Sequence, residues 1–261
     1  MTTTDAVLRL VIALPLGLVF GSFLTVAIHR VPAGESIVRP RSRCPSCGTR
    51  LRNVDNVPVV SWLALRGRCR SCGARISSVY PLTELASGVL FVAVALTYED
   101  LWQVIVLAPF LGLLVALSVI DVRHHRIPNA LVYPALIISA GFVVAGELAG
   151  DHLNVLDAVI GFLAYGIGLL VVALIAPTGM GMGDVKLAGL IGLVLGAIAL
   201  ELVAVAAGVG IAFGGVGAIV ALVLGASRKT RLPYGPFMAV GAAFAVFFGE
   251  AIADAYLSLI T

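Results

Sequence analysis

Two aspartates, Asp121 and Asp184, lie at the ends of apolar segments, where an ionisable side chain is costly to bury. Two carboxylates a few ångströms apart share one proton, so one can activate a water molecule while the other polarises a carbonyl group. This pair indicates an aspartyl peptidase that uses neither a metal nor a nucleophilic serine. The alternative is that each aspartate is a helix N-cap or a counter-charge to nearby arginines.

The residues after Asp184 indicate where its side chain points. Ala188, Gly192 and Gly196 follow it at steps of four, so all four residues share one face of a helix. Small residues at this spacing let two helices approach closely. We therefore expect Asp184 to point into a tight helix interface rather than at lipid.

Four further residues are candidates for supporting roles. Gly181 and Gly183 precede Asp184 and would let backbone or a substrate strand pass close to its carboxylate. Lys186 either tunes the pair electrostatically or extends to lipid headgroups. Glu84 is a third acidic residue near a span end, and it either serves a cofactor or holds a loop against the membrane.

All four cysteines belong to two Cys-x-x-Cys pairs, Cys44 with Cys47 and Cys69 with Cys72, separated by 21 residues. This spacing is typical of a structural zinc ribbon, because two thiolates so placed can both reach one tetrahedral metal ion. The loop 29–80 has few aliphatic residues to form a core, so a metal would stabilise it. Free thiols and disulfides are the alternatives, and a reducing cytoplasm disfavours disulfides.

The elements that must position these residues are membrane-spanning helices. The chain is 60% hydrophobic and 12% charged, where soluble proteins average about 25% charged. Its apolar runs have the length that a helix needs to cross a hydrocarbon core of about 30 Å. We predict an all-α polytopic membrane protein of about eight spans and a zinc-ribbon-like loop, and we keep the first span as a helix rather than a cleaved signal. The predicted spans are 6–28, 80–98, 101–120, 128–148, 156–176, 185–200, 202–224 and 233–252.

Charge predicts the orientation of these spans. Sixteen of the 17 lysines and arginines fall on one side, ten of them in the loop 29–80. Basic loops stay in the cytoplasm, so the loop and both aspartates are expected at the cytoplasmic face. We interpret the arginines as topology signals and contacts to membrane lipids, and expect no nucleic-acid partner.

Motifs along nearly the whole chain resemble one family, the prepilin peptidases, which are Gly-x-Gly-Asp membrane aspartyl proteases. The two cysteine pairs match, and Asp121 with Ile127-Pro-Asn129 is similar to the first catalytic motif of the family. Gly181-Met-Gly-Asp-Val-Lys186 is similar to the second. Further resemblance lies in Gly21–Pro32, Ser61-Trp-Leu63, Tyr80-Pro-Leu-Thr-Glu84 and Pro233-Tyr-Gly-Pro-Phe237.

The resemblance implies an enzyme of the bacterial inner membrane that acts on type IV prepilin or type II secretion pseudopilin precursors. It would cleave a short basic leader, typically after a glycine, and N-methylate the new amino terminus from S-adenosylmethionine. It also implies two domains: residues 1–98, including the loop, for methyl transfer, and residues 99–261 for peptide hydrolysis. No glycine-rich nucleotide loop locates the methyl-donor site.

Two other functions stay open from the sequence. A proton-coupled transporter of small solutes could use the aspartates as a proton relay, although no paired interrupted helices recur in the two halves. The chain could also be a membrane anchor for a zinc module that docks partners.

Overall fold

The computed structural model describes residues 2–39, 41–175, 180–225, 227 and 232–260. The chain divides into two compact units, Met1–Leu96 and Thr97–Thr261. In the described ranges every named element of secondary structure is a helix, and two isolated β-bridges lie in the cysteine loop. The predicted all-helical class is therefore confirmed. The basic residues Arg228, Lys229 and Arg231, used to predict orientation, lie outside the described residues.

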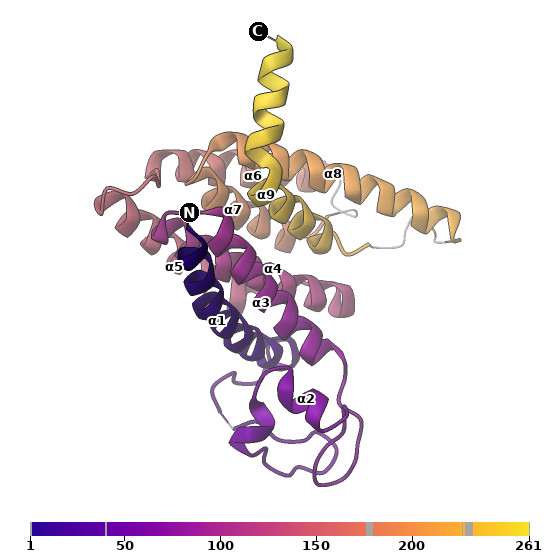
Figure 1. The fold of residues 1–261 in the computed structure, drawn as a ribbon. Helices are drawn as coiled ribbons and strands as arrows, with labels where there is room; N and C mark the ends of the chain where they lie inside the picture. Colours follow the sequence, from indigo (N-terminus) through magenta and orange to yellow (C-terminus); the bar gives the residue numbers. More distant parts are fainter. Residues whose placement is uncertain (1, 40, 176–179, 226, 228–231, 261) are drawn as a thin grey trace. The chain divides into compact units, whose positions relative to one another are not determined.

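The first unit consists of two long helices and the loop between them. Its helical elements are α1 (Thr3–Arg30), the 3-10 helix η1 (Asn53–Asn56), α2 (Val60–Ala64) and α3 (Val79–Thr97). The long helices pack through small residues: a Cβ atom added to Gly17 would lie 2.8 Å from Cα of Gly88. One added to Gly21 would lie 2.7 Å from Cα of Glu84. This close approach puts the end of α1 beside the start of α3, directly above the loop in the view of Figure 1.

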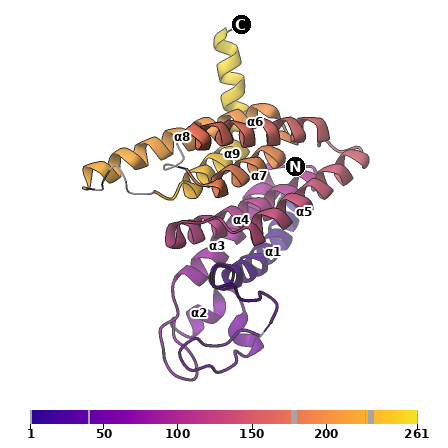
Figure 2. The ribbon, with the colours of Figure 1, turned by 180° about the vertical axis from the view of Figure 1, so that it is seen from behind.

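The second unit contains six helices. They are α4 (Leu101–His124), α5 (Asn129–Leu148), α6 (Val155–Ile175), α7 (Met182–Gly196), α8 (Leu200–Val223) and α9 (Gly235–Ile260). Helix α6 runs along α7 (Figure 2), and backbone atoms of Gly161 and Gly192 meet at their contact. Gly196 also faces α6. The predicted tight interface on this face of α7 is therefore present.

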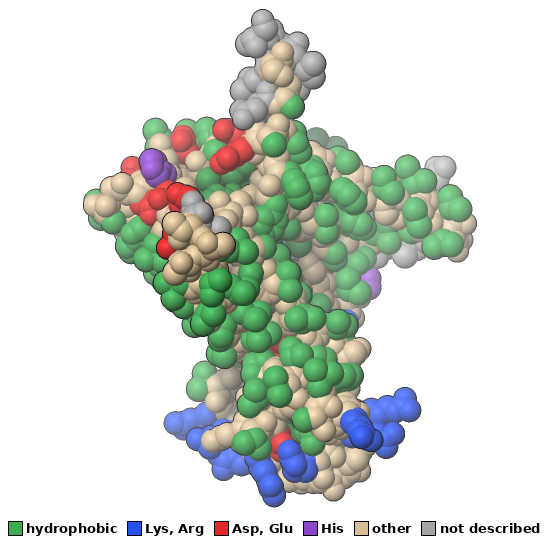
Figure 3. All heavy atoms as spheres, viewed as in Figure 1, with side chains coloured by type: hydrophobic (Ala, Val, Ile, Leu, Met, Phe, Trp, Pro, Cys, Tyr) green, Lys and Arg blue, Asp and Glu red, His purple; other side chains and the backbone are tan. Residues whose placement is uncertain are grey.

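Seven helices in the described part are long and apolar enough to cross a membrane. The exception among the predicted spans is α7, whose 15 residues extend about 22 Å. Large apolar side chains cover the outer faces of the helices (Figure 3), as expected where helices meet lipid. The predicted boundary between the sixth and seventh spans, at Glu201, is wrong by a few residues, because the turn between α7 and α8 is formed by residues 197–199. Glu201 instead lies in the first turn of α8, where the helix dipole favours an acidic side chain.

The two ends of the second unit differ in their polar contacts. At one end, Asp151 accepts a hydrogen bond from Trp102 N–H, and Glu147 accepts one from Val155 N–H. These bonds join the start of α4, the end of α5 and the start of α6. The end of α4 and the starts of α5, α7 and α9 therefore belong to the opposite end, which carries both predicted catalytic aspartates.

The α6–α7 contact predicts a stability difference between two glycines of one helix. A Cβ atom at Gly161 would collide with the carbonyl of Gly192, whereas one at Gly168 meets no atom within 4 Å. We expect Gly161→Ala to reduce the free energy of unfolding by about 1–3 kcal/mol, the usual range for overpacking. Thermal unfolding in detergent measures this effect, with Gly168→Ala as the matched control. Equal melting temperatures for the two variants would contradict the contact.

Candidate functional site

Asp121 is held in the last turns of α4 by the start of another helix. Its side chain is buried, with the residue only 5% exposed. Oδ2 accepts a hydrogen bond from the backbone N–H of Gly235 at 2.9 Å, 114 residues further along the chain. Gly235 is the first residue of α9, so Asp121 satisfies a donor at that helix N-terminus. A side chain at 235 would crowd this carboxylate, because its Cβ would lie 2.9 Å from Oδ2.

Asp184 occupies the first turn of α7 and is half-buried. Its Oδ2 accepts a hydrogen bond from the N–H of Gly181 at 3.0 Å. Neither aspartate is the N-cap residue of its own helix, because Asp184 is the third residue of α7 and Asp121 lies near the end of α4; each accepts one backbone N–H at the start of a helix. These hydrogen bonds are compatible with a chemical role, because each fixes a carboxylate in place. Within the described residues, neither Oδ1 atom has a hydrogen-bond partner.

Contacts join the start of α7 to the segment after α4, at the end of the second unit that carries both aspartates. A Cβ at Gly183 would lie 3.0 Å from Cβ of Ile127, so the first turn of α7 rests on this segment. Lys186 Nζ donates a hydrogen bond to Oδ1 of Asn129 at 2.8 Å and lies 5.3 Å from the ring centroid of Tyr133. Lys186 therefore binds the start of α5.

Two tyrosines at this end were not predicted as site residues. Tyr165 on α6 and Tyr234, just before α9, both lie within electrostatic range of Asp184. Tyr165 is 5% exposed, and its hydroxyl has no hydrogen-bond partner among the described residues. The only sequence signal for Tyr165 is a hydroxyl-bearing residue within an apolar run.

The cysteines form a second site, within the first unit. The four Sγ atoms lie within 4.8 Å of one another, and Cys44 and Cys72 have a separation of 3.9 Å between sulfurs. Tetrahedral zinc with Zn–S bonds of about 2.3 Å requires sulfurs about 3.8 Å apart. The cluster therefore fits a tetrahedral metal ion, and all four cysteines are free thiols.

Both cysteine pairs use the same backbone turn. Cys44 N–H donates to Thr49 O and Gly48 N–H to Cys44 O; Cys69 N–H and Gly73 N–H repeat this pattern. Gly48 and Gly73 have φ angles of +71° and +72°, which glycine adopts without strain. One isolated bridge flanks each turn. The Cys-x-x-Cys spacing thus forms two equivalent hairpin-like turns, and the four sulfur atoms on these turns lie close together.

Polar contacts around the cluster favour metal binding and fix the loop. The hydroxyl and N–H of Thr49 lower the pKa of Cys47 to about 6. Despite the N–H of Ala74, contact with Cys47 raises the pKa of Cys72 to about 11, so the first thiolate forms at Cys47. Asp55 forms a two-pronged ion pair with Arg70 at 2.7 and 2.9 Å. Its hydrogen bonds to Arg70 also hold the pKa of Asp55 below its usual value. This pair joins η1 to the second cysteine turn.

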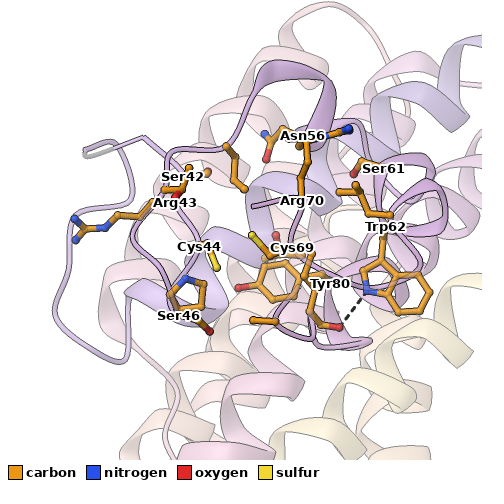
Figure 4. Close-up of a pocket in the computed structure, with 18 of the residues that line it drawn as sticks. Ser42, Arg43, Cys44, Ser46, Asn56, Ser61, Trp62, Cys69, Arg70 and Tyr80 are labelled. Carbon is orange, nitrogen blue, oxygen red and sulfur yellow. Dashed lines mark hydrogen bonds and ion pairs between the residues drawn. The ribbon is translucent and has the colours of Figure 1, made fainter. Parts of the chain in front are cut away.

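A cavity of about 910 Å³ lies beside the cluster, between the loop, the last turns of α1 and the first turns of α3 (Figure 4). Glu84 lines it and is 7% exposed. Oε2 of Glu84 accepts a hydrogen bond from Val59 N–H at 2.7 Å. The alternative in which Glu84 holds the loop thus has a direct contact to support it.

Comparison with known proteins gives matches over most of the chain. Residues 16–98 match the bacterial peptidase A24 N-terminal domain, and residues 108–226 match the type IV leader peptidase family. Similar proteins called prepilin leader peptidase/N-methyltransferase occur in Stutzerimonas stutzeri, at 34% identity over 94% of this chain and 92% of that protein. Those of Burkholderia pseudomallei and Bacillus subtilis are 36% and 33% identical, covering 93% of this chain and 86% and 96% of their own lengths. No solved structure matches.

Proposed function

Because this chain belongs to the type IV leader peptidase family, peptidase A24, and is a prepilin leader peptidase/N-methyltransferase, we propose that Asp121 and Asp184 are its catalytic pair. The resemblance found in the sequence is thereby confirmed, and the chain is a multi-pass membrane protein of bacteria. Family membership also removes the reason to consider a transporter or a simple membrane anchor. The observation that best supports the pair is that hydrogen bonds from Gly235 and Gly181 hold both carboxylates at one end of the second unit.

In the proposed reaction the pair holds one proton. The ionised carboxylate takes a proton from water as the water oxygen attacks the scissile carbonyl carbon. The protonated carboxylic acid meanwhile donates its proton to the carbonyl oxygen. Collapse of the tetrahedral intermediate breaks the C–N bond, and the departing nitrogen receives a proton from the pair. Gly181 and Gly235 position the two acids through backbone N–H groups, and Gly183 and Lys186 hold α7 against Ile127 and Asn129.

The proposed substrates are type IV prepilins and pseudopilins with a basic leader. The leader would be cut at the cytoplasmic face of the inner membrane, where the arginine-rich loop also lies and contacts lipid headgroups. The positive loop supports this orientation, because basic segments are retained in the cytoplasm.

Two cofactors are proposed for the first unit, to which we assign methyl transfer, while Thr97–Thr261 carries peptide hydrolysis. Zinc would bind Cys44, Cys47, Cys69 and Cys72 as a structural ion. S-adenosylmethionine would supply the methyl group for the new amino terminus. The relatives' names, which include N-methyltransferase, support the second assignment.

Mass spectrometry of a co-expressed precursor tests both activities together. The active chain should yield a pilin that lacks its leader and carries one added methyl group at its new amino terminus. A precursor that keeps its leader would contradict the peptidase assignment. A cleaved but unmethylated product would contradict the methyltransferase assignment alone.

The contact between Gly235 and Asp121 gives a further prediction. We expect Gly235→Ala to reduce precursor cleavage about 10- to 100-fold, because its methyl group displaces the carboxylate and small displacements of catalytic groups have effects of this size. Gly208→Ala, at a position with no atom within 4 Å of an added Cβ, is the control and should cleave normally. Cleavage rates in detergent measure both. A normal rate for Gly235→Ala would mean that the position of Asp121 is unimportant.

A further inference from the structure

The cavity of the first unit has the size and the walls of a small-molecule site. Its volume of about 910 Å³ falls within the range of about 300–1,000 Å³ that is usual for ligand pockets. All of its lining residues belong to Met1–Leu96. The cysteine turns lie on one side of it, and the last turns of α1 and the first turns of α3 on the other.

Three aromatic rings contribute to the cavity wall. The rings of His29 and Tyr80 stack with centroids 4.6 Å apart and an angle of 18° between planes. The indole N–H of Trp62 donates to Ile76 O at 3.2 Å, which fixes the ring of Trp62 (Figure 4). Ordered aromatic rings of this kind stack on a planar heterocycle.

The wall also contains a carboxylate that lacks a cation. Glu84 accepts hydrogen bonds from Val59 and Ser22, but among the described residues it forms no ion pair with a lysine or arginine. A nearly buried carboxylate is stabilised by a positive charge in direct contact. Several arginines also line the cavity, including Arg43, Arg50 and Arg75. They can bind a carboxylate of a ligand.

The backbone at Val59 is strained at this place. Val59 has φ +59° and ψ −51°, and its neighbours Pro58 and Val60 are joined by a hydrogen bond of 2.5 Å around it. A β-branched residue rarely adopts this turn, and such strain concentrates at functional sites. The bond from Val59 N–H to Glu84 maintains the turn at the start of α2, the helix that carries Trp62.

We propose that this cavity is the methyl-donor site, with Glu84 facing the positive sulfur of S-adenosylmethionine and the aromatic rings contacting its adenine. The proposal rests on the methyltransferase part of the proposed function. A bound donor supplies an electrophilic methyl carbon: an N–C bond forms as the C–S bond breaks, the electron pair stays on sulfur, and the amine releases its proton to water. The product, S-adenosylhomocysteine, is a neutral thioether, so Glu84 distinguishes donor from product by charge.

Equilibrium binding to the purified full chain in detergent tests the role of Glu84. We expect Glu84→Gln, which keeps an oxygen to accept from Val59 N–H, to weaken binding of S-adenosylmethionine at least about tenfold. Binding of S-adenosylhomocysteine should change by less than about threefold. Glu201→Gln, which changes an exposed carboxylate of the second unit outside the cavity, should leave both affinities within about twofold. Equal effects of Glu84→Gln on both ligands would overturn the charge contact.

Photolabelling locates the site without relying on any variant. Ultraviolet irradiation with radiolabelled S-adenosylmethionine should label peptides within residues 60–84, and excess S-adenosylhomocysteine should prevent it. Label confined to Thr97–Thr261, in a preparation that still methylates pilin, would overturn the cavity assignment and leave the proposed function intact. Absence of both labelling and methylation would overturn the two together.

Discussion

Asp121→Asn and Asp184→Asn are each expected to reduce precursor cleavage by about 10³-fold or more. Asparagine is nearly isosteric with aspartate and keeps an oxygen to accept from Gly235 or Gly181, so the helix starts should remain capped. It can neither take a proton from water nor donate an acidic proton to the carbonyl group. General acid–base groups typically contribute factors of 10² to 10⁴, and here the two acids share both roles.

Two controls separate loss of chemistry from loss of structure. Glu201→Gln removes an exposed acid at the opposite end of the second unit and should cleave at the normal rate. The melting temperatures of both asparagine variants should match that of the unmodified chain. Near-normal cleavage by either asparagine variant would exclude that residue from the catalytic pair.

The second large effect is expected at the cysteine cluster. Replacing Cys69 and Cys72 by serine should remove the bound zinc and expose the arginine-rich loop to trypsin. Structural zinc sites of this type bind with about 10–16 kcal/mol, and that energy also stabilises the fold around them. The loop has few other buried contacts, since Cys44, Gly67 and Cys69 are its only buried residues in the described ranges. Metal analysis and limited trypsin digestion provide the two measurements.

The serines between the cysteines offer a matched control for this experiment. Ser46→Ala and Ser71→Ala change exposed side chains within the same two turns and should keep both zinc and resistance to trypsin. A full complement of zinc in the double cysteine variant would show that the metal binds elsewhere. An unmodified chain purified without any bound metal would refute the cluster as a zinc site.

The positions of the helices followed closely from the sequence. Hydropathy located the ends of each long helix to within a few residues, because lipid-facing segments must be apolar over a fixed length. The exception is α9, which extends further toward the C-terminus than predicted. The spacing of the cysteines predicted the cluster, since a metal ion imposes its own geometry. By contrast, α2 and η1 were missed, because a loop held by a four-cysteine cluster and by an ion pair between Asp55 and Arg70 has no periodic pattern.

The partners of the catalytic side chains were harder to predict. The motif Pro233–Phe237 was noticed, but no periodicity indicates that Gly235 donates a hydrogen bond to Asp121. Nor does the sequence reveal the unpartnered hydroxyl of Tyr165, which depends on how α6 packs. The cavity around Glu84 is likewise a product of tertiary packing, and the strained turn at Val59 has no local sequence signal.

The cleavage rate of the double variant, Asp121→Asn with Asp184→Asn, tests the central claim that the two carboxylates act on one water molecule. Groups that act as a unit lose their effect together, so a second substitution adds little to the first. We predict a residual rate within about threefold of either single variant, measured over long single-turnover reactions. Losses that multiply, so that the double variant falls far below both single variants, would show that the aspartates act independently and would contradict the shared site.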